Sequence, residues 1–253
     1  MKIEHISISR ESTFNECPQN YKYKYEIKMV PKEEPIHFFY GKVVHKIIEK
    51  YTLAKGMVRI EDITSNVMSG DIKLEHNSVG KLKPLPFWYR EKLPTHLRNF
   101  LKLSQHLGTE GEVEWNFSFD LDPPYGRKLV GFIDRMIPKD DKMFIVDFKT
   151  TKKGKWRKTK ETVHNDLQLQ SYARVVQKEF GLKAENIKTA LYYLEDAELI
   201  SASFSQKTLD SVEGRLLNVY KNIEKTPQET VIGTPGEHCF HCDYKAVCPF
   251  YKK

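Results

Sequence analysis

Two apolar runs with a short polar turn between them predict a β-hairpin near the middle of the chain. The runs cover residues 129–137 and 143–150, and the polar turn is Lys139-Asp-Asp-Lys142. Side chains alternate between the two faces of a strand, so Asp147 and Lys149 are expected on the same face. Because Asp and Lys are rarely buried unless they are paired or bind a ligand, this face of the hairpin is a candidate functional site.

The rest of the pattern predicts helices on both sides of the hairpin and three further strands. Apolar residues three and four apart predict helices, whereas strict alternation of apolar and polar residues predicts strands. The expected helices are a short serine-capped helix with one cysteine in it within 7–28, then 36–55, 94–107, 164–180 and 207–224, with a short helix and loops in 57–80. The further strands are expected at 111–120, 188–195 and 199–204. This order of elements predicts an α/β or α+β fold with a mixed central sheet flanked by helices.

Two carboxylates, Asp134 and Asp147, are predicted to converge at the end of the hairpin. Converging carboxylates repel each other and shift each other's pKa unless a cation lies between them. Hard divalent ions such as Mg²⁺ prefer oxygen ligands, so a metal site is the simplest interpretation. The alternative is an exposed edge or an ordinary salt bridge, which is the commoner meaning of an isolated Asp-x-Lys in a strand.

Two other polar residues, on other predicted elements, are candidates that decide nothing by themselves. His45 is on the flank of the helix expected at 36–55, where a lone histidine is more often a surface or core group than a ligand. Glu114 is on the polar side of the strand expected at 111–120. It could orient a metal-bound water or the lysine, but a solvent-facing glutamate is the preferred interpretation.

The composition is that of a folded chain with an anionic partner. With 253 residues, 40% of them hydrophobic and 12% aromatic, the chain can bury a full core as one large domain or as one domain with an appendage. No apolar run has the roughly 20 residues of a membrane span, and the N-terminus carries no apolar signal segment, so a cytoplasmic location without membrane contact is expected. The formal net charge of +7 suits nucleic acid.

A basic stretch from Lys152 to Lys160 directly follows the second strand of the hairpin. It is either a solvated mobile loop or a loop that grips phosphates and stacks on a base. The candidate substrate-binding residues in it are Lys152, Lys153, Lys155, Trp156 and Arg157.

Four cysteines form a set that is split between the two ends of the chain. Three of them follow C-x2-C-x5-C spacing, and the fourth lies near the N-terminus; they are Cys239, Cys242, Cys248 and Cys17. In a protein that is expected in the cytoplasm, such a set argues for metal or cluster ligation and against disulfides. Zinc and an iron–sulfur cluster both accept four cysteines, and the spacing together with two neighbouring histidines slightly favours zinc.

Taken in order along the chain, these motifs resemble the RecB-type branch of the PD-(D/E)XK nucleases. The motifs are His45 with Gly41 before it and Glu49 after it, GFID at 131–134, DFK at 147–149, and Gln168-x-x-x-Tyr172. The cysteine set is similar to that of the members with a 4Fe–4S cluster, namely the CRISPR-associated RecB-like exonucleases and the AddB-type nuclease domain. The resemblance covers nearly the whole chain, from Ser9 to Pro249.

The resemblance implies a role for each of these residues. His45, Asp134 and Asp147, with the carbonyl group of Phe148, would bind Mg²⁺ or Mn²⁺. Lys149 would position or activate the attacking water and stabilise the developing charge, so Asp134, Asp147 and Lys149 form the implied catalytic set. Because a histidine nitrogen makes the ligand set softer than Mg²⁺ favours, higher activity is expected with Mn²⁺.

The resemblance also implies how the substrate and the cofactor are held. Gln168 and Tyr172 would guide the DNA strand, and the 4Fe–4S cluster would replace zinc as the preferred group on the four cysteines. One nuclease domain over 1–253 is implied, with a restriction-endonuclease-like core at 110–205, a helical insertion at 57–107, and a cysteine-ligated subregion that joins 1–30 to 233–253.

The expected function is that of a metal-dependent DNA nuclease, an exonuclease acting on single strands or on DNA ends, with a helicase or an integrase as a possible partner. The alternative is a catalytically silent subunit of the same fold that binds nucleic acid or supports an assembly. An RNA nuclease is a third reading, because phosphate chemistry does not distinguish the sugars and only contacts to the 2′-hydroxyl would.

Overall fold

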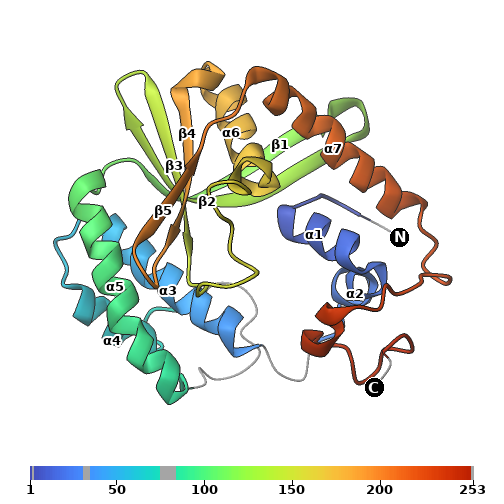
Figure 1. Ribbon diagram of the computed structural model, residues 1–253, viewed down its shortest axis with the longest axis horizontal. Coiled ribbons are helices and arrows are strands. Elements are labelled where there is room, and N and C mark those ends of the chain that lie inside the picture. Colours follow the sequence, from blue (N-terminus) through green and yellow to red (C-terminus); the bar gives the residue numbers. More distant parts are fainter. Residues whose placement is uncertain (2, 31–34, 75–83, 252–253) are drawn as a thin grey trace. The chain divides into compact units, whose positions relative to one another are not determined.

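The computed structural model describes residues 1, 3–30, 35–74 and 84–251, and within them the expected order of helices and strands is confirmed (Figure 1). The helices are α1 (Ile8–Glu16), α2 (Pro18–Tyr21), α3 (Ile36–Leu53), α4 (Ile60–Ser69), α5 (Phe87–Leu107), α6 (Leu167–Phe180) and α7 (Gln206–Lys225). The strands are β1 (Glu112–Asp122), β2 (Arg127–Lys139), β3 (Lys142–Lys149), β4 (Ile187–Tyr193) and β5 (Glu198–Ala202). Part of the segment expected to hold a short helix and loops, residues 75–80, lies outside the described residues, as do residues 75–83 of the expected insertion.

The described strands form one mixed sheet in the order β1-β2-β3-β4-β5. β2 and β3 are antiparallel, β3 and β4 are parallel, and β4 and β5 are antiparallel. The parallel pair requires a crossover, and α6 supplies it between β3 and β4. The sheet therefore has the mixed α+β architecture that the element order predicted.

The chain divides into two compact units. One comprises Met1–Glu33, Asn116–Gly131 and Asp210–Lys253, and the other comprises Glu34–Trp115 and Phe132–Leu209. Strands β1 and β2 contribute residues to both units. Both cysteine-bearing segments lie in the first unit, whereas the hairpin carboxylates lie in the second.

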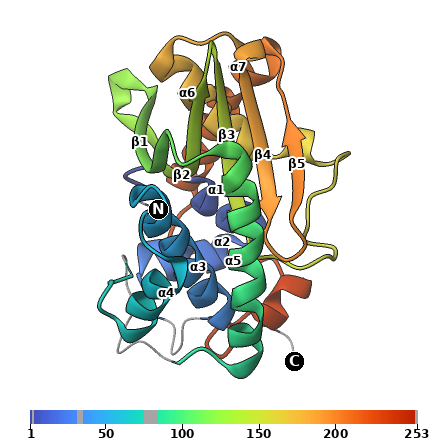
Figure 2. The ribbon, with the colours of Figure 1, turned by 90° about the vertical axis from the view of Figure 1, so that its left-hand side faces the viewer.

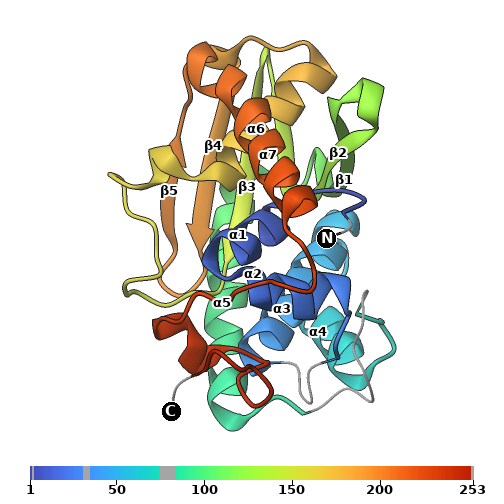
Figure 3. The same ribbon diagram turned by 90° about the vertical axis from the view of Figure 1, so that its right-hand side faces the viewer.

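The core of the second unit packs α3, α4 and α5 against one face of the sheet. Val146 and Phe148 of β3 and Tyr192 of β4 belong to this buried cluster. Figures 2 and 3 view the sheet from opposite sides, and α5 lies in front of it in Figure 2. Because strand residues alternate between faces, burying Phe148 on the α5 side directs Asp147 and Lys149 toward α6.

In the first unit, helix α1 begins as the serine pattern predicted. Ser7 is the N-cap, and its side chain accepts a hydrogen bond from the backbone N–H of Arg10. Cys17 is not inside the helix, because it is the residue at which α1 ends and α2 begins. Phe14 and Tyr21 pack with Ile223 of α7 in a small core.

Helix α5 begins earlier than the sequence predicted. The expected start near Pro94 is wrong, because the helix begins at Phe87 and contains Pro94 in its interior. An interior proline removes one backbone hydrogen bond and costs about 3 kcal/mol relative to alanine. The buried residues Leu93, Leu97 and Phe100 lie on either side of Pro94 in the sequence, so tertiary packing outweighs the local preference. No described helix combines the length and the apolar character needed to cross a bilayer.

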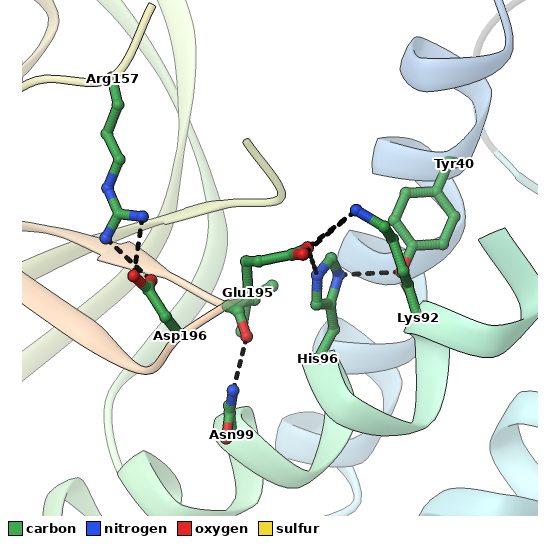
Figure 4. Close-up of polar contacts among 8 residues, drawn as sticks. Tyr40, Lys92, His96, Asn99, Arg157, Glu195 and Asp196 are labelled. Carbon is green, nitrogen blue, oxygen red and sulfur yellow. Dashed lines mark hydrogen bonds and ion pairs between the residues drawn. The ribbon is translucent and has the colours of Figure 1, made fainter. Parts of the chain in front are cut away.

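A buried polar network links α3, α5 and the turn after β4 (Figure 4). The hydroxyl of Tyr40 lies 2.8 Å from Nδ1 of His96, and Nε2 of His96 lies 2.9 Å from Oε2 of Glu195. Lys92 donates to the same carboxylate at 3.2 Å, and the side-chain amide of Asn99 donates to the carbonyl group of Leu194 at 2.8 Å. With His96 only 1% exposed, its ring is held by partners on both nitrogens.

This network makes stability depend on pH. Burial lowers the pKa of His96 below its usual value of 6.5, and the Glu195 carboxylate offsets this only in part. As the pH falls below 6.5, the unfolded chain binds a proton at His96 more readily than the folded chain does, so the free energy of unfolding decreases. Above that pH both states are neutral at this residue, and no further change is expected from it.

We expect His96→Phe to remove this pH dependence and to destabilise the protein by about 1–3 kcal/mol at neutral pH, since the buried Tyr40 hydroxyl loses its partner. Urea unfolding of both proteins at several pH values between about 7.5 and 5.5 gives the comparison. Two stability curves that fall in parallel would show that His96 does not contribute to the pH dependence.

Candidate active site

The hairpin brings two buried acidic residues to one point of the sheet. β2 and β3 pair with Arg135 opposite Val146 and Lys139 opposite Lys142, and Asp140 takes a left-handed conformation in the turn (φ 56°). Oδ2 of Asp134 accepts a hydrogen bond from the backbone N–H of Phe148 at 2.7 Å. Asp134 is 9% exposed and Asp147 is 2% exposed, so both acids are removed from water.

Helix α3 places His45 against this pair. Nε2 of His45 lies 3.1 Å from the carbonyl oxygen of Phe148, so the proton on Nε2 can be donated to it. Nδ1 of His45 lies 3.5 Å from Oδ2 of Asp134, with 30% of the His45 side chain exposed. The structure therefore brings His45, Asp134 and the Phe148 carbonyl group together, as the resemblance implied.

Glu114 belongs to the same group, and the preference for a solvent-facing glutamate is wrong. Its Oε1 lies 3.8 Å from Nδ1 of His45, and its side chain is 30% exposed. The backbone at Glu114 has φ 48°, a left-handed conformation that is uncommon for residues other than glycine. Sequence reasoning assumed a regular extended strand in which alternation points Glu114 outward. The sequence around Glu114 contains no signal that predicts this left-handed backbone conformation.

Lys149 is held between a carboxylate and an amide. Its Nζ lies 2.7 Å from Oδ2 of Asp147 and donates to Oε1 of Gln168 at 3.0 Å. The amide nitrogen of Gln168 in turn donates to the hydroxyl of Tyr172 at 2.8 Å. Asp166 caps α6 by accepting the N–H of Leu169 at 3.0 Å, which fixes the start of the helix that carries Gln168 and Tyr172.

Through these contacts, Gln168 hydrogen-bonds directly to Lys149, and Tyr172 is connected to the lysine through Gln168. The resemblance implies that they guide the DNA, but in the described structure their side chains form a relay to Lys149, and Tyr172 is 5% exposed. The sequence spacing placed them correctly on one face of a helix, whereas the direction of that face came from the fold.

The electrostatics of the site follow from burial and close packing of charge. Burial raises the pKa of Asp147 to about 6; Asp134 adds to this rise and Lys149 opposes it. Burial also opposes the charges on His45 and Lys149, but the neighbouring carboxylates outweigh it and raise the pKa of both groups. For Asp134, burial is outweighed by His45, and its pKa is lowered. The site therefore gathers several partly exposed charged groups around two carboxylates that are almost fully buried.

The donor set fits a divalent cation. One nitrogen of His45 and one carboxylate oxygen each from Glu114 and Asp134 all lie within 4.8 Å of one another. Two carboxylates with one imidazole are a common ligand set for Mn²⁺ and similar ions. Asp147 is outside this group in the structure, because its carboxylate pairs with Lys149. The site can therefore hold a cation among His45, Glu114 and Asp134, while the ammonium group of Lys149 pairs with Asp147.

The basic loop after β3 is anchored at one residue and exposed at others. Arg157 is buried, and its guanidinium donates to Asp196 at 2.8 and 3.1 Å (Figure 4). The same group donates to Glu198 at 2.6 Å and lies over the ring of Tyr193. These partners replace the phosphate contact that the sequence suggested for Arg157. The other candidate residues, Lys152, Lys153, Lys155 and Trp156, are exposed, and the ammonium of Lys155 lies 4.9 Å from the Trp156 ring centre.

The four cysteines line one cavity of the first unit. Cys17 is buried, and Cys239, Cys242 and Cys248 are half-buried free thiols. The hydroxyl of Tyr244 donates to the carbonyl group of Met29 at 3.1 Å, which ties the C-terminal segment to the N-terminal one.

Comparison with known proteins gives the family. Among solved structures, the chain is similar to a candidate exonuclease from Eubacterium rectale, with 16% identity, a TM-score of 0.56, and coverage of 99% of this chain and 90% of that one. It is also similar to the structure of SSO0001, with 14% identity, a TM-score of 0.46, and coverage of 100% and 90%. No curated protein sequence matches the chain. Residues 5–249 match the family model of the PD-(D/E)XK nuclease superfamily, and the chain therefore belongs to this superfamily.

Proposed function

We propose that the protein is a metal-dependent DNA nuclease that hydrolyses phosphodiester bonds in single strands or at DNA ends. The observation that carries the proposal is the convergence of His45, Glu114 and Asp134 beside the Asp147–Lys149 pair. A nuclease must stabilise the negative charge that develops on the phosphate oxygens. A cationic group and metal-binding groups gathered around two buried carboxylates are suited to that task.

The metal ligands proposed are His45, Asp134 and Asp147, with the carbonyl group of Phe148, and Glu114 joins them on the strength of its distance to His45. A bound Mn²⁺ or Mg²⁺ ion would stabilise the developing charge and lower the pKa of water at the site. The protein's own part is to fix the donors: Asp134 is oriented by the Phe148 N–H, and the N–H of His45 is oriented by the Phe148 carbonyl group.

Lys149 is the proposed cationic group of the reaction. Its ammonium is oriented by Asp147 and Gln168, so it can donate to a phosphate oxygen or to the attacking water without a large rearrangement. Gln168 and Tyr172 act as positioning residues for Lys149 in this proposal. Their assignment to the DNA path rests on the family resemblance alone.

The substrate contacts proposed are on the basic loop. Lys152, Lys153 and Lys155 are exposed and suit phosphate groups, and the exposed ring of Trp156 suits stacking on an unpaired base. Stacking on a base requires that the base be free, which favours single strands or frayed ends over intact duplex. The similarity to a candidate exonuclease supports action from an end. A helicase or integrase partner would supply such ends.

We also propose that Cys17, Cys239, Cys242 and Cys248 hold a 4Fe–4S cluster. The support is that all four cysteines line one cavity and that their spacing in the sequence resembles that of the members with such a cluster. A cluster held from both ends of the chain would stabilise the first unit, because it closes a very long loop. Structural zinc on the same cysteines is the alternative.

The test is a nuclease assay of the full-length protein on end-labelled single-stranded DNA, duplex DNA and RNA of one sequence. We expect Mn²⁺-dependent degradation of single-stranded DNA, with a ladder from one labelled end that gives the polarity, and lower activity in Mg²⁺. EDTA and the Asp134→Asn variant should abolish it. Activity that survives in Asp134→Asn would exclude this site, and tight DNA binding without cleavage under any condition would instead support the silent-subunit alternative.

A further inference from the structure

A short 3₁₀ segment, Glu237–His241, carries two histidines that have different surroundings. His238 is half-buried and lines the same cavity as the four cysteines, whereas His241 is exposed. His238 directly precedes Cys239 in the sequence, and His241 follows it two positions later. Because only His238 lines the cavity, substitutions of the two histidines can be compared directly.

The Nε2 atom of His238 is buried and has no hydrogen-bond partner among the described residues. Buried polar atoms in native proteins are nearly always satisfied, and an exception calls for a missing ligand, ion or water. Because His238 lines the cysteine cavity, the group bound by the cysteines is the nearest candidate for that partner.

The backbone beside the histidine leaves room for its ring. A Cβ atom at Gly236 would lie 3.1 Å from both Cε1 and Nδ1 of His238, which is tighter than ordinary contact. The N–H of Gly236 also lies 3.5 Å from the sulfur of Cys239. Glycine at this position therefore lets the imidazole ring and the Cys239 sulfur approach the same piece of backbone.

We propose that His238 donates a hydrogen bond from its Nε2–H to a sulfur atom of the cluster held by the cysteines. The inference rests on the proposed cluster and assigns to this chain a fifth residue that acts on it. His238 is a positioning residue in this role, since it does not bind iron. A hydrogen bond to sulfur stabilises the more negatively charged, reduced cluster, so it raises the reduction potential.

The first experiment measures the reduction potential of the anaerobically purified full-length protein by EPR-monitored titration. In His238→Phe the ring volume is kept and the donor is lost, so we expect a more negative potential. His238→Gln keeps an N–H donor and should remain closer to wild type. His241→Phe is the matched control, because His241 is exposed, and it should leave the potential unchanged. Equal potentials in wild type and His238→Phe would overturn the inference while leaving the cluster in place.

The second experiment needs no variant and decides the matter if His238→Phe does not retain its cluster. In protein with ¹⁵N-labelled histidine, electron–nuclear double resonance of the reduced cluster should show a weak nitrogen coupling and an exchangeable proton. Absence of both, or a strong coupling typical of a direct iron–nitrogen bond, would overturn the hydrogen bond. Purified protein that carries zinc and no iron would overturn the proposed cluster and this inference together.

Discussion

Replacing Lys149 with alanine is expected to lower the rate of DNA cleavage by about 100-fold or more, because removing one oriented group that stabilises charge in the transition state typically costs 10²–10³ in rate. The ammonium of Lys149 is fixed by Asp147 at 2.7 Å and by Gln168 at 3.0 Å. The loss should appear in kcat with little change in KM, since the interaction strengthens only as charge develops. Single-turnover cleavage of end-labelled DNA in Mn²⁺ is the measurement.

Two controls make this result specific. Lys188→Ala removes an exposed lysine of β4 that pairs with Ser203 at 2.9 Å, away from the hairpin carboxylates, and should retain the wild-type rate. Because Lys149→Ala leaves the buried Asp147 without its cation, thermal unfolding of the variant must be compared with that of wild type. A folded Lys149→Ala protein that cleaves at the wild-type rate would exclude Lys149 from the reaction.

Replacing Glu114 with glutamine is expected to weaken Mn²⁺ binding by about 10-fold or more, the range found when groups that support a metal site are altered. The carboxylate lies 3.8 Å from His45 and within 4.8 Å of the other donor atoms, so its charge acts directly on a cation there. Calorimetric titration of the DNA-free protein with Mn²⁺ measures the affinity without any dependence on turnover.

Glu112→Gln is the matched control for Glu114, since it removes the same charge from an exposed position two residues earlier in β1. We expect it to leave the affinity close to wild type. Equal losses in the two variants would mean that only the overall negative charge matters. An unchanged affinity in Glu114→Gln would remove this residue from the proposed ligand set.

Much of the site was readable from the sequence because it rests on local patterns. The hairpin, its turn and the alternation of side chains place Asp147 and Lys149 on one face of β3, and the structure has them 2.7 Å apart. The spacing of Gln168 and Tyr172 likewise predicted that they share one face of a helix, and in the structure a hydrogen bond joins them there. These relations need only the geometry of a strand or a helix.

The misread residues are those whose environment depends on distant parts of the chain. The basic loop suggested that Arg157 contacts phosphate. In the structure its guanidinium instead forms ion pairs with Asp196 and Glu198, which lie about 40 positions later in the sequence. Pro94 looked like the start of a helix, but packing of the residues beside it carries α5 through the proline. The residues next to Arg157 or Pro94 in the sequence do not indicate which distant residues will pack against them.

The sequence by itself determined the order of elements and the mixed sheet, and it named candidate carboxylate, lysine, histidine and cysteine residues. Only the tertiary structure decided which of these residues meet. Glu114 joins His45 because a left-handed backbone angle turns it from the expected direction, and His238 lines the cysteine cavity while His241 stays exposed. The physical reason is that periodicity fixes the face of an element on which a side chain lies, whereas contacts between elements and single backbone angles fix what that side chain touches.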